Sequence, residues 1–184
     1  AQAWCNTFAS SNLDSRELAA ILETTKSDDV FISSTYSVPF AASEKILNGD
    51  KVFFLSAEEA ENSAYGFAND NARIANYGNS AGVWWLRSPY AYDASRAGAV
   101  YGTGDVDSNI AYDDCPARPA FNLDLNSVLF TSAAVGGKSA SGMDSGLTAV
   151  DDYTGSEWKL TLLDSSRSSF TVDASEAETS VEVG

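Results

Sequence analysis

The stretch VWWLRSPYAYDASRAGAVYGTGDVDSNIAYDDCPARPAFNLDL, residues 83–125, changes its chemical character twice and predicts how the rest of the chain is organised. Its two ends, residues 83–86 and 118–123, are rich in the β-branched and aromatic residues that favour buried strands. Between them, residues 90–117 are mostly Tyr, Asp, Ser, Ala, Gly and Asn. They contain no Lys, Glu, Gln, Met or Trp, although the rest of the chain holds 21 residues of these five types. We therefore expect two rigid segments that hold a different kind of surface between them.

Two interpretations fit the composition of residues 90–117. A surface rich in Tyr and Ser is typical of recognition sites, because Tyr offers a large contact area at low entropic cost and small polar residues offer adaptable hydrogen bonds. The same small polar residues also dominate ordinary irregular loops. Composition alone leaves both interpretations open.

The overall composition limits the classes of protein and partner. A chain of 184 residues, 44% hydrophobic and 11% aromatic, is long enough to bury a substantial core. The net charge of −15 argues against nucleic acid and anionic membrane surfaces as partners, and no apolar run is long enough for an integral membrane protein. The chain has no histidine, which excludes Ser-His-Asp and Cys-His catalysis and histidine-based metal sites.

Two short motifs predict where helices begin. Asp14, followed three residues later by Glu17, forms a capping box in which each side chain accepts a hydrogen bond from the other residue's backbone N–H. We expect this helix to end near Lys26. Ser56 and Glu59 repeat the pattern and predict a second helix, whose acidic first turn complements the helix dipole.

Weaker signals surround these helices. Trp4 and Phe8, four residues apart, predict a short helical turn that faces the core. Residues 30–40 predict a short strand and a loop, and residues 50–55 predict a buried strand. Residues 62–82 are rich in Asn, Ala and Gly and predict a surface loop with short helical pieces.

The C-terminal part predicts one strand, one long loop and one hairpin. A strand is expected at residues 127–130, a surface loop at 135–157 and a terminal hairpin at 158–172. We expect residues 1–172 to form a single domain. Residues 173–184 are acidic and polar, which is typical of a linker to a downstream region that this sequence does not include.

A possible calcium site begins at Asp105. Asp105, Asp107 and Asn109 match the opening of a calcium-binding loop, but the glycine and glutamate that the motif requires are missing. A strand is the simpler interpretation, with Val106 and Ile110 facing inward and the three polar residues facing solvent.

Other charged residues invite catalytic or structural interpretations. Asp93, Asp113 and Asp114 offer a glycosidase-like pair of carboxylates, but adjacent residues of a strand point to opposite faces, so a solvated acidic surface is favoured. Arg87 and Arg118 lie in otherwise apolar strands, where arginine pairs with carboxylates or carbonyls, so we expect structural roles for both. None of these residues implies a cofactor.

The two cysteines, Cys5 and Cys115, are far apart in sequence. Their spacing fits neither a zinc site nor a redox motif. A disulfide between them would tie the N-terminus to the end of the central stretch, and we favour it slightly over the alternative of two free, buried thiols.

Four blocks of the chain together resemble a known family. They are K-V-F-F-L-S-x-E-E from residue 51, W-W-L-R-S-P from residue 84, G-x-V from residue 98 and R-P-A-F-N-L from residue 118. The set resembles a domain-of-unknown-function family of secreted proteins from gut Firmicutes, which is similar to the C-type-lectin-like/formylglycine-generating-enzyme fold group. The resemblance implies an α+β fold, with two helices packed on twisted antiparallel sheets and long irregular surface loops, and a location outside the cell or on its surface.

Some members of this fold group are variable proteins of diversity-generating retroelements, in which adenines of selected codons are randomised. Randomised Asn codons yield Tyr, Asp, Ser, Ala and Gly, among others, but never Lys, Glu, Gln, Met or Trp. The resemblance therefore implies a hypervariable-type binding surface at residues 90–117. Its expected contact residues are Tyr90, Tyr92, Asp93, Ser95, Arg96, Tyr101, Asp105, Asp107, Asn109, Tyr112, Asp113 and Asp114.

The enzymatic branch of the fold group is not implied. Its members resemble one another in a closely spaced copper-binding cysteine pair, unlike Cys5 and Cys115, and the Glu-Pro-Asn or Gln-Pro-Asp signature of calcium-dependent sugar binding is missing. We expect a non-enzymatic adhesion or recognition module without a cofactor, which binds an unknown protein or glycan and is tethered through a downstream region. A structural surface module without a ligand site and a polysaccharide hydrolase that uses Asp pairs are the alternatives.

Overall fold

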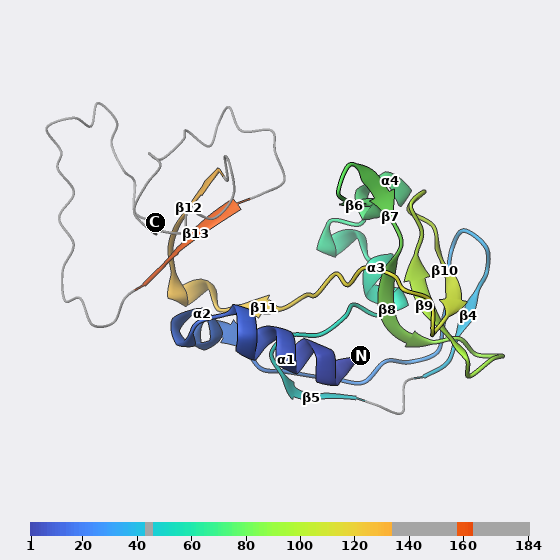
Figure 1. Cartoon of the computed structure of the whole chain (residues 1–184), viewed down its shortest axis with the longest axis horizontal. Helices are drawn as coiled ribbons and strands as arrows, with labels where there is room; N and C mark the ends of the chain where they lie inside the picture. Colours follow the sequence, from blue (N-terminus) through green and yellow to red (C-terminus); the bar gives the residue numbers. More distant parts are fainter. Residues whose placement is uncertain (43–45, 134–157, 164–184) are drawn as a thin grey trace, which may run out of the picture. The chain divides into compact units, whose positions relative to one another are not determined.

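The computed structural model describes residues 1–42, 46–133 and 158–163 (Figure 1). The chain divides into two compact units, residues 1–125 (unit 1) and residues 126–184 (unit 2), so a boundary falls inside the range that we assigned to one domain. Short helices and antiparallel strands alternate along the chain, which confirms the α+β class. No helix within the described residues is long and apolar enough to span a membrane.

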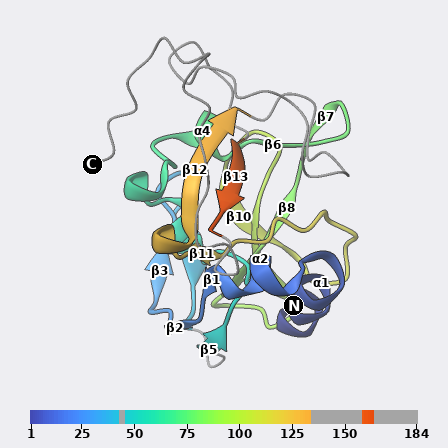
Figure 2. The same cartoon turned by 90° about the vertical axis from the view of Figure 1, so that its left-hand side faces the viewer.

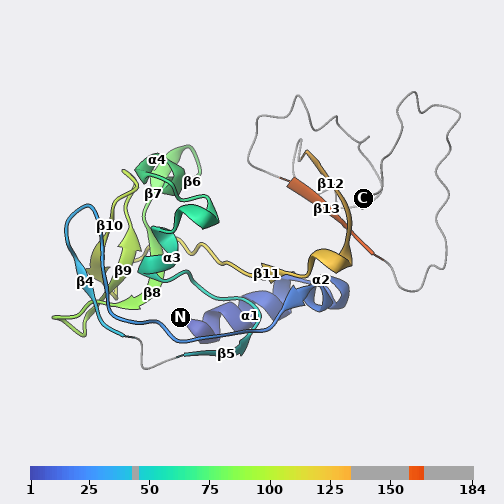
Figure 3. The same cartoon turned by 180° about the vertical axis from the view of Figure 1, so that it is seen from behind.

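Unit 1 is organised around one antiparallel sheet with the strand order β10-β9-β8 (Figure 3). Four two-stranded antiparallel pairs accompany it: β1-β11, β2-β5, β3-β4 and β6-β7. The elements are α1 (Gln2–Asn12), α2 (Ser15–Ala19), β1 (Ile21–Leu22), β2 (Thr24–Lys26), β3 (Phe31–Ile32), β4 (Pro39–Phe40), β5 (Leu47–Asp50), α3 (Ala57–Ala60), the 3-10 helix η1 (Ser63–Tyr65), α4 (Asp70–Arg73), β6 (Ala75–Tyr77), β7 (Ser80–Gly82), β8 (Trp84–Pro89), β9 (Arg96–Val100), β10 (Val106–Ile110) and β11 (Asn122–Leu123).

The main core of unit 1 lies on one face of the β8–β10 sheet. Burial along β8 alternates strictly, which is the period of a strand with one face in the core. Gly98 on β9 is required by close packing, because a Cβ atom there would lie 3.1 Å from the Phe40 ring and 3.2 Å from the Leu86 Cβ. The cluster consists of Val38, Phe40, Ala57, Ala60, Trp84, Leu86, Val100 and Val106.

A smaller core lies beneath α1. Its buried members are Cys5, Ala9, Val52 and Phe54. The predicted helix at the N-terminus is therefore confirmed, but it is longer than one turn and Cys5 and Ala9 form its buried face. Trp4 is 45% exposed, so its expected inward orientation is wrong.

Both predicted capping boxes are confirmed, at Asp14 and at Ser56. The helix that begins at Asp14 ends at Ala19, however, and not near Lys26. Ile21 and the next residue instead pair with β11. The Lys51 ammonium donates hydrogen bonds to the carbonyls of Leu18 and Ile21 at 2.7 and 2.6 Å, which satisfies backbone oxygens near the helix end. Long-range pairing therefore overrides the local helical pattern.

The predicted strands between the helices are confirmed in part. Residues 30–40 form β3 and β4, and the regular strand near residue 50 is β5. Val52 and Phe54 are buried as expected, but of residues 51–55 only Phe53 forms a bridge, with Ala120. That bridge joins two of the sequence blocks that characterise the chain.

The short helix η2 (Leu125–Ser127) crosses the unit boundary. Unit 2 contains the antiparallel pair β12 (Val128–Ala133) and β13 (Trp158–Leu162) (Figure 2). The predicted strand at residues 127–130 is confirmed. Residue 158 begins a strand, as expected for a hairpin, and this strand pairs with β12. The expected loop 135–157, the hairpin's second strand and the linker 173–184 lie outside the described residues.

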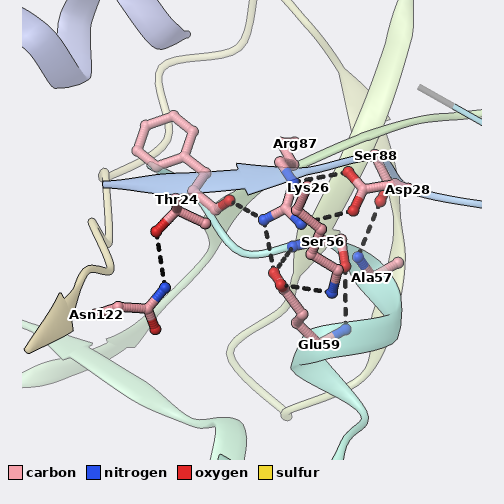
Figure 4. Close-up of polar contacts among 10 residues, drawn as sticks. Thr24, Lys26, Asp28, Ser56, Ala57, Glu59, Arg87, Ser88 and Asn122 are labelled. Carbon is pink, nitrogen blue, oxygen red and sulfur yellow. Dashed lines mark hydrogen bonds and ion pairs between the residues drawn. The ribbon is translucent and has the colours of Figure 1, made fainter. Parts of the chain in front are cut away.

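A buried ion network joins β8 to two other segments of unit 1 (Figure 4). Arg87 donates two hydrogen bonds to Asp28, at 2.6 and 2.7 Å, and a third to Glu59 at 2.6 Å. All three side chains are at most 8% exposed. Lys26 adds an ion pair to Glu59 at 2.8 Å. The expected structural role of Arg87 is confirmed, and the two carboxylates that it pairs with are 59 and 28 residues away in sequence.

Glu59 is both a helix cap and the centre of this network. Its carboxylate accepts the backbone N–H of Ser56 at 2.9 Å while it pairs with Arg87 and Lys26. Burial by itself would raise the pKa of Glu59, but the hydrogen bonds from Arg87, Lys26 and Ser56 outweigh burial and lower the pKa to about 2. The carboxylate is therefore ionised throughout the physiological range.

We expect Glu59→Gln to destabilise the fold by about 3 kcal/mol, because the substitution leaves a buried arginine short of negative charge. Glu58→Gln is the matched control: the neighbouring side chain is exposed, and its replacement should change stability by less than about 0.5 kcal/mol. Chemical denaturation at neutral pH measures both values.

The same comparison has a defined pH dependence. The pKa of Glu59 is lower in the folded protein than its ordinary value of 4.5, so its stabilisation is complete above pH 4.5 and is lost as the pH falls toward 2. The gap between native protein and Glu59→Gln should therefore narrow across that window. Equal losses for the two glutamine variants at neutral pH would contradict the assigned role of the network.

Candidate functional site

A cleft of about 340 Å³ lies between the start of α1, the β8–β9 part of the sheet and the segment that follows β10. Most of its surface is apolar. The side chains and backbone that line it belong to Ala1, Trp4, Phe54, Trp85, Leu86, Ala97, Ala111, Cys115 and Ala117.

Aromatic rings form one wall of the cleft. Trp4 stacks on Phe8 with ring centroids 5.3 Å apart, and it meets Phe54 at 5.7 Å. Trp85 follows the buried Trp84 along β8, so its side chain points to the opposite face of the sheet. Trp85 pairs with Ala99, and the small side chains of β9 on that face leave space over the sheet.

Residues 111–117 form another wall. The Ala111 N–H donates to the Ser95 carbonyl at 2.8 Å, which joins this segment to the β8–β9 turn. Backbone hydrogen bonds from Asp113 to Ile110, at 3.0 Å, and from Cys115 to Asp113, at 3.1 Å, fold the segment into tight turns. The wall is therefore fixed by backbone contacts, whereas the side chains of residues 112–114 are exposed.

The two cysteines are free thiols, so the favoured disulfide is not formed. Cys5 is fully buried in the smaller core, where burial raises the pKa of its thiol. Cys115 belongs to the wall of the cleft, and its sulfur accepts a hydrogen bond from the Asn109 amide at 3.5 Å. Each thiol thus has its own packing environment.

Arg118 and Arg73 connect α4 to the sheet through contacts with Trp84 on β8 and with the β9–β10 turn. The Arg118 guanidinium lies 4.7 Å from the Trp84 ring and donates to the Arg73 carbonyl at 3.1 Å, which confirms its structural role. Arg73 forms a salt bridge with Asp70 and donates to the Gly104 carbonyl at 2.7 Å. Gly104 has a φ of +92°, so glycine is favoured at this turn.

Residues 1–125 match the model of a protein family described as a domain of unknown function, DUF6273. The chain belongs to this family. The match ends at residue 125, where unit 1 also ends. No curated protein and no solved structure matches the chain. Unit 1 is therefore the DUF6273 domain, and the cleft lies within it.

The twelve expected contact residues differ in their exposure in the DUF6273 domain. Five are exposed, and they occupy the β8–β9 turn and the segment after β10, which meet at the same end of the sheet through the Ser95–Ala111 hydrogen bond. We call these five the end surface: Tyr92, Asp93, Tyr112, Asp113 and Asp114. Tyr92 and Tyr112 are 80% and 79% exposed.

The other seven are half-buried, so the expectation that all twelve are exposed is wrong. Tyr90 packs against the main core and meets the Tyr92 ring edge-on at 5.7 Å, so it supports its neighbour. Tyr101 and Asp105 lie at the opposite end of the β9–β10 hairpin from the end surface. Ser95 joins the two segments of the end surface. The remaining three are Arg96, Asp107 and Asn109.

The side chains of those three residues and of Tyr101 form hydrogen bonds with backbone groups on the outer edge of β10. In the antiparallel ladder the odd-numbered residues of β10 bond to β9, so the backbone groups of even-numbered residues point outward. Asp107 accepts the Ser108 N–H at 2.5 Å, and Asn109 accepts the Ile110 N–H at 2.9 Å.

The outward carbonyl of Ser108 is covered as well. It accepts hydrogen bonds from the Arg96 guanidinium at 2.6 Å and from the Tyr101 hydroxyl at 3.3 Å. Side chains that occupy edge groups in this way prevent another strand from pairing there. Four expected contact residues therefore have a structural role that composition did not show.

The calcium interpretation of residues 105–109 gives way to the strand interpretation. Asp107 and Asn109 are half-buried on β10, and Val106 is buried as expected, whereas Ile110 is 36% exposed, so its inward orientation is wrong. Ser108 takes the inward position instead. Among the residues that the structure describes, no three Cys, Asp or Glu side chains are grouped to hold a metal ion.

We expect Asp107→Ala/Asn109→Ala to cause concentration-dependent self-association, because it leaves two backbone N–H groups uncapped on the edge of the sheet. Asp107→Asn is the matched control: it removes the same negative charge but keeps both side-chain acceptors. Sedimentation velocity over a range of concentrations distinguishes the two variants. Identical sedimentation of both would show that these side chains do not protect the edge.

Proposed function

We propose that this DUF6273 domain is a non-enzymatic ligand-recognition module whose binding surface combines the end surface with the aromatic cleft. The observation that carries the proposal is their shared wall: the segment that exposes Tyr112, Asp113 and Asp114 also lines the cleft through Ala111, Cys115 and Ala117. A concave apolar site beside exposed tyrosines and small polar groups is the usual composition of a recognition site.

The separation between the frame, which is the β8–β10 sheet with its core, and the end surface supports the same proposal. The end surface lies outside regular strands, and its side chains make few contacts with the core. The Asp93 carboxylate accepts the Ser95 N–H at 2.9 Å and so caps the turn before β9. Substitutions at the other four positions change what a ligand meets without changing β8, β9 or β10. We propose on this basis that the residues are of the hypervariable type, as in a target protein of a diversity-generating retroelement on a C-type-lectin-like scaffold.

The proposed setting follows from the same analogy. The module is extracellular or displayed on the cell surface, is tethered through a downstream region, and binds a protein or a glycan. The acidic end surface, with three Asp among its five residues, favours a neutral or cationic ligand over an anionic one.

The gene itself provides the test. Deep sequencing of this gene and its flanking DNA across a clonal lineage should show substitutions concentrated in codons 92, 93 and 112–114, with a near-copy template beside a reverse transcriptase. Codons 107 and 109 are the internal comparison: they have the same composition bias but structural roles, so they should vary less. Variation no higher than in the flanking strands, with no template, would contradict diversification.

A further inference from the structure

The rings of the cleft offer apolar faces that no arginine side chain described in unit 1 covers. Elsewhere in unit 1 arginine packs on aromatic rings, as Arg118 does on Trp84 at 4.7 Å and Arg87 does on Phe53 at 5.6 Å. Among the described residues, no arginine of the chain lies over Trp4, Phe54 or Trp85. These rings remain available to a group from outside.

Six of the basic side chains that the structure describes in unit 1 are bonded internally. Residues 90–117 contain five Asp and one basic residue, Arg96, which is bonded to Ser108. The Ala1 ammonium also belongs to the lining of the cleft, so the five Asp residues outnumber two positive charges. The internal partners are Glu59 for Lys26, the Leu18 and Ile21 carbonyls for Lys51, Asp70 and Gly104 for Arg73, Asp28 and Glu59 for Arg87, and the Arg73 carbonyl for Arg118.

Shape and charge together specify one kind of occupant. A cleft of about 340 Å³ is large enough for one long side chain. An arginine combines an apolar stem, a planar group that stacks on indole rings and a charge that carboxylates attract. Asp113 and Asp114 lie between Ala111 and Cys115, which line the cleft, and their side chains are exposed, so they face the solvent from which such a group would enter.

We propose that the cleft binds an arginine side chain of a protein ligand. The guanidinium and its stem lie against Trp4 and Trp85, and Asp113 and Asp114 supply the opposite charge. This inference rests on the proposed recognition function and names the chemistry of its ligand.

The tryptophans of unit 1 allow a test within one molecule. In ¹H–¹⁵N spectra of residues 1–184, Nα-acetyl-arginine methylamide should shift the indole N–H signals of Trp4 and Trp85. Trp84, whose indole N–H donates to the Arg73 carbonyl at 3.1 Å inside the core, is the reference. The neutral isostere, Nα-acetyl-citrulline methylamide, should bind about tenfold more weakly.

Two double variants locate the charge that matters. Asp113→Asn/Asp114→Asn should reduce the preference for arginine over citrulline to about twofold or less. Asp29→Asn/Glu58→Gln removes the same total charge from exposed positions in segments that contribute no residue to the cleft, and it should leave the preference unchanged. Thermal denaturation verifies that both variants remain folded.

Each other outcome overturns the inference in a specific way. Equal affinities for arginine and citrulline probes would remove the cationic requirement while leaving the cleft as a binding site. Binding of phenyltrimethylammonium without binding of the arginine probe would assign the cleft to a small ammonium ion. No shift at Trp4 and Trp85 with any probe would leave the cleft without this role, and the codon variation would then decide separately whether the domain recognises ligands.

Discussion

The guanidinium of Arg87 is the group on which the arrangement of the DUF6273 domain depends. It donates to Asp28, to Glu59 and to the Phe54 carbonyl, and so joins β8 to three segments that precede it. A buried charge is tolerated only when it is paired and hydrogen-bonded, so these segments have one arrangement in which the arginine is satisfied. That arrangement places α3 and the segment before it against the sheet.

A fixed β8 determines what each face of the sheet does. Trp84 and Leu86 point into the main core with Val100 and Val106, while Trp85 points to the other face and lines the cleft. The small residues of β9 then leave room for a cleft, and the segment after β10 closes it. The main core and the candidate site consequently share β8, and the wall at residues 111–117 connects the cleft with the end surface.

Local chemistry made part of this structure predictable. The capping boxes at Asp14 and Ser56 depend on residues three positions apart, so the sequence contains all their partners. Strands β8 and β10 follow from alternation and β-branched or aromatic residues, whereas β9, with the sequence RAGAV, was not predicted. An arginine in an apolar strand requires partners wherever they are. The composition of residues 90–117 indicated a surface, and five of its twelve expected contact residues are exposed.

The rest depends on partners distant in sequence. The early end of α2 follows from pairing with β11, about a hundred residues later, and Asp28 gives no local sign that it will face Arg87. Tyr, Asp and Asn occur both on recognition surfaces and on protected edges, so composition could not separate Tyr92 from Tyr101 or Asp113 from Asp107. The cleft was missed, although the aromatic pair Trp4 and Phe8 and the consecutive Trp84 and Trp85 were its signal in the sequence.

The central claim is that a strictly specified frame carries a surface whose side chains are free to change. Saturation mutagenesis of residues 1–125, scored by resistance of the displayed protein to protease, tests it most directly. The account predicts that Tyr92, Tyr112, Asp113 and Asp114 of the end surface accept nearly all residues, while Glu59, Arg87, Tyr90 and Gly98 accept few. Restriction of the end surface as strong as that of the frame would contradict the account, because those side chains would then be needed for folding.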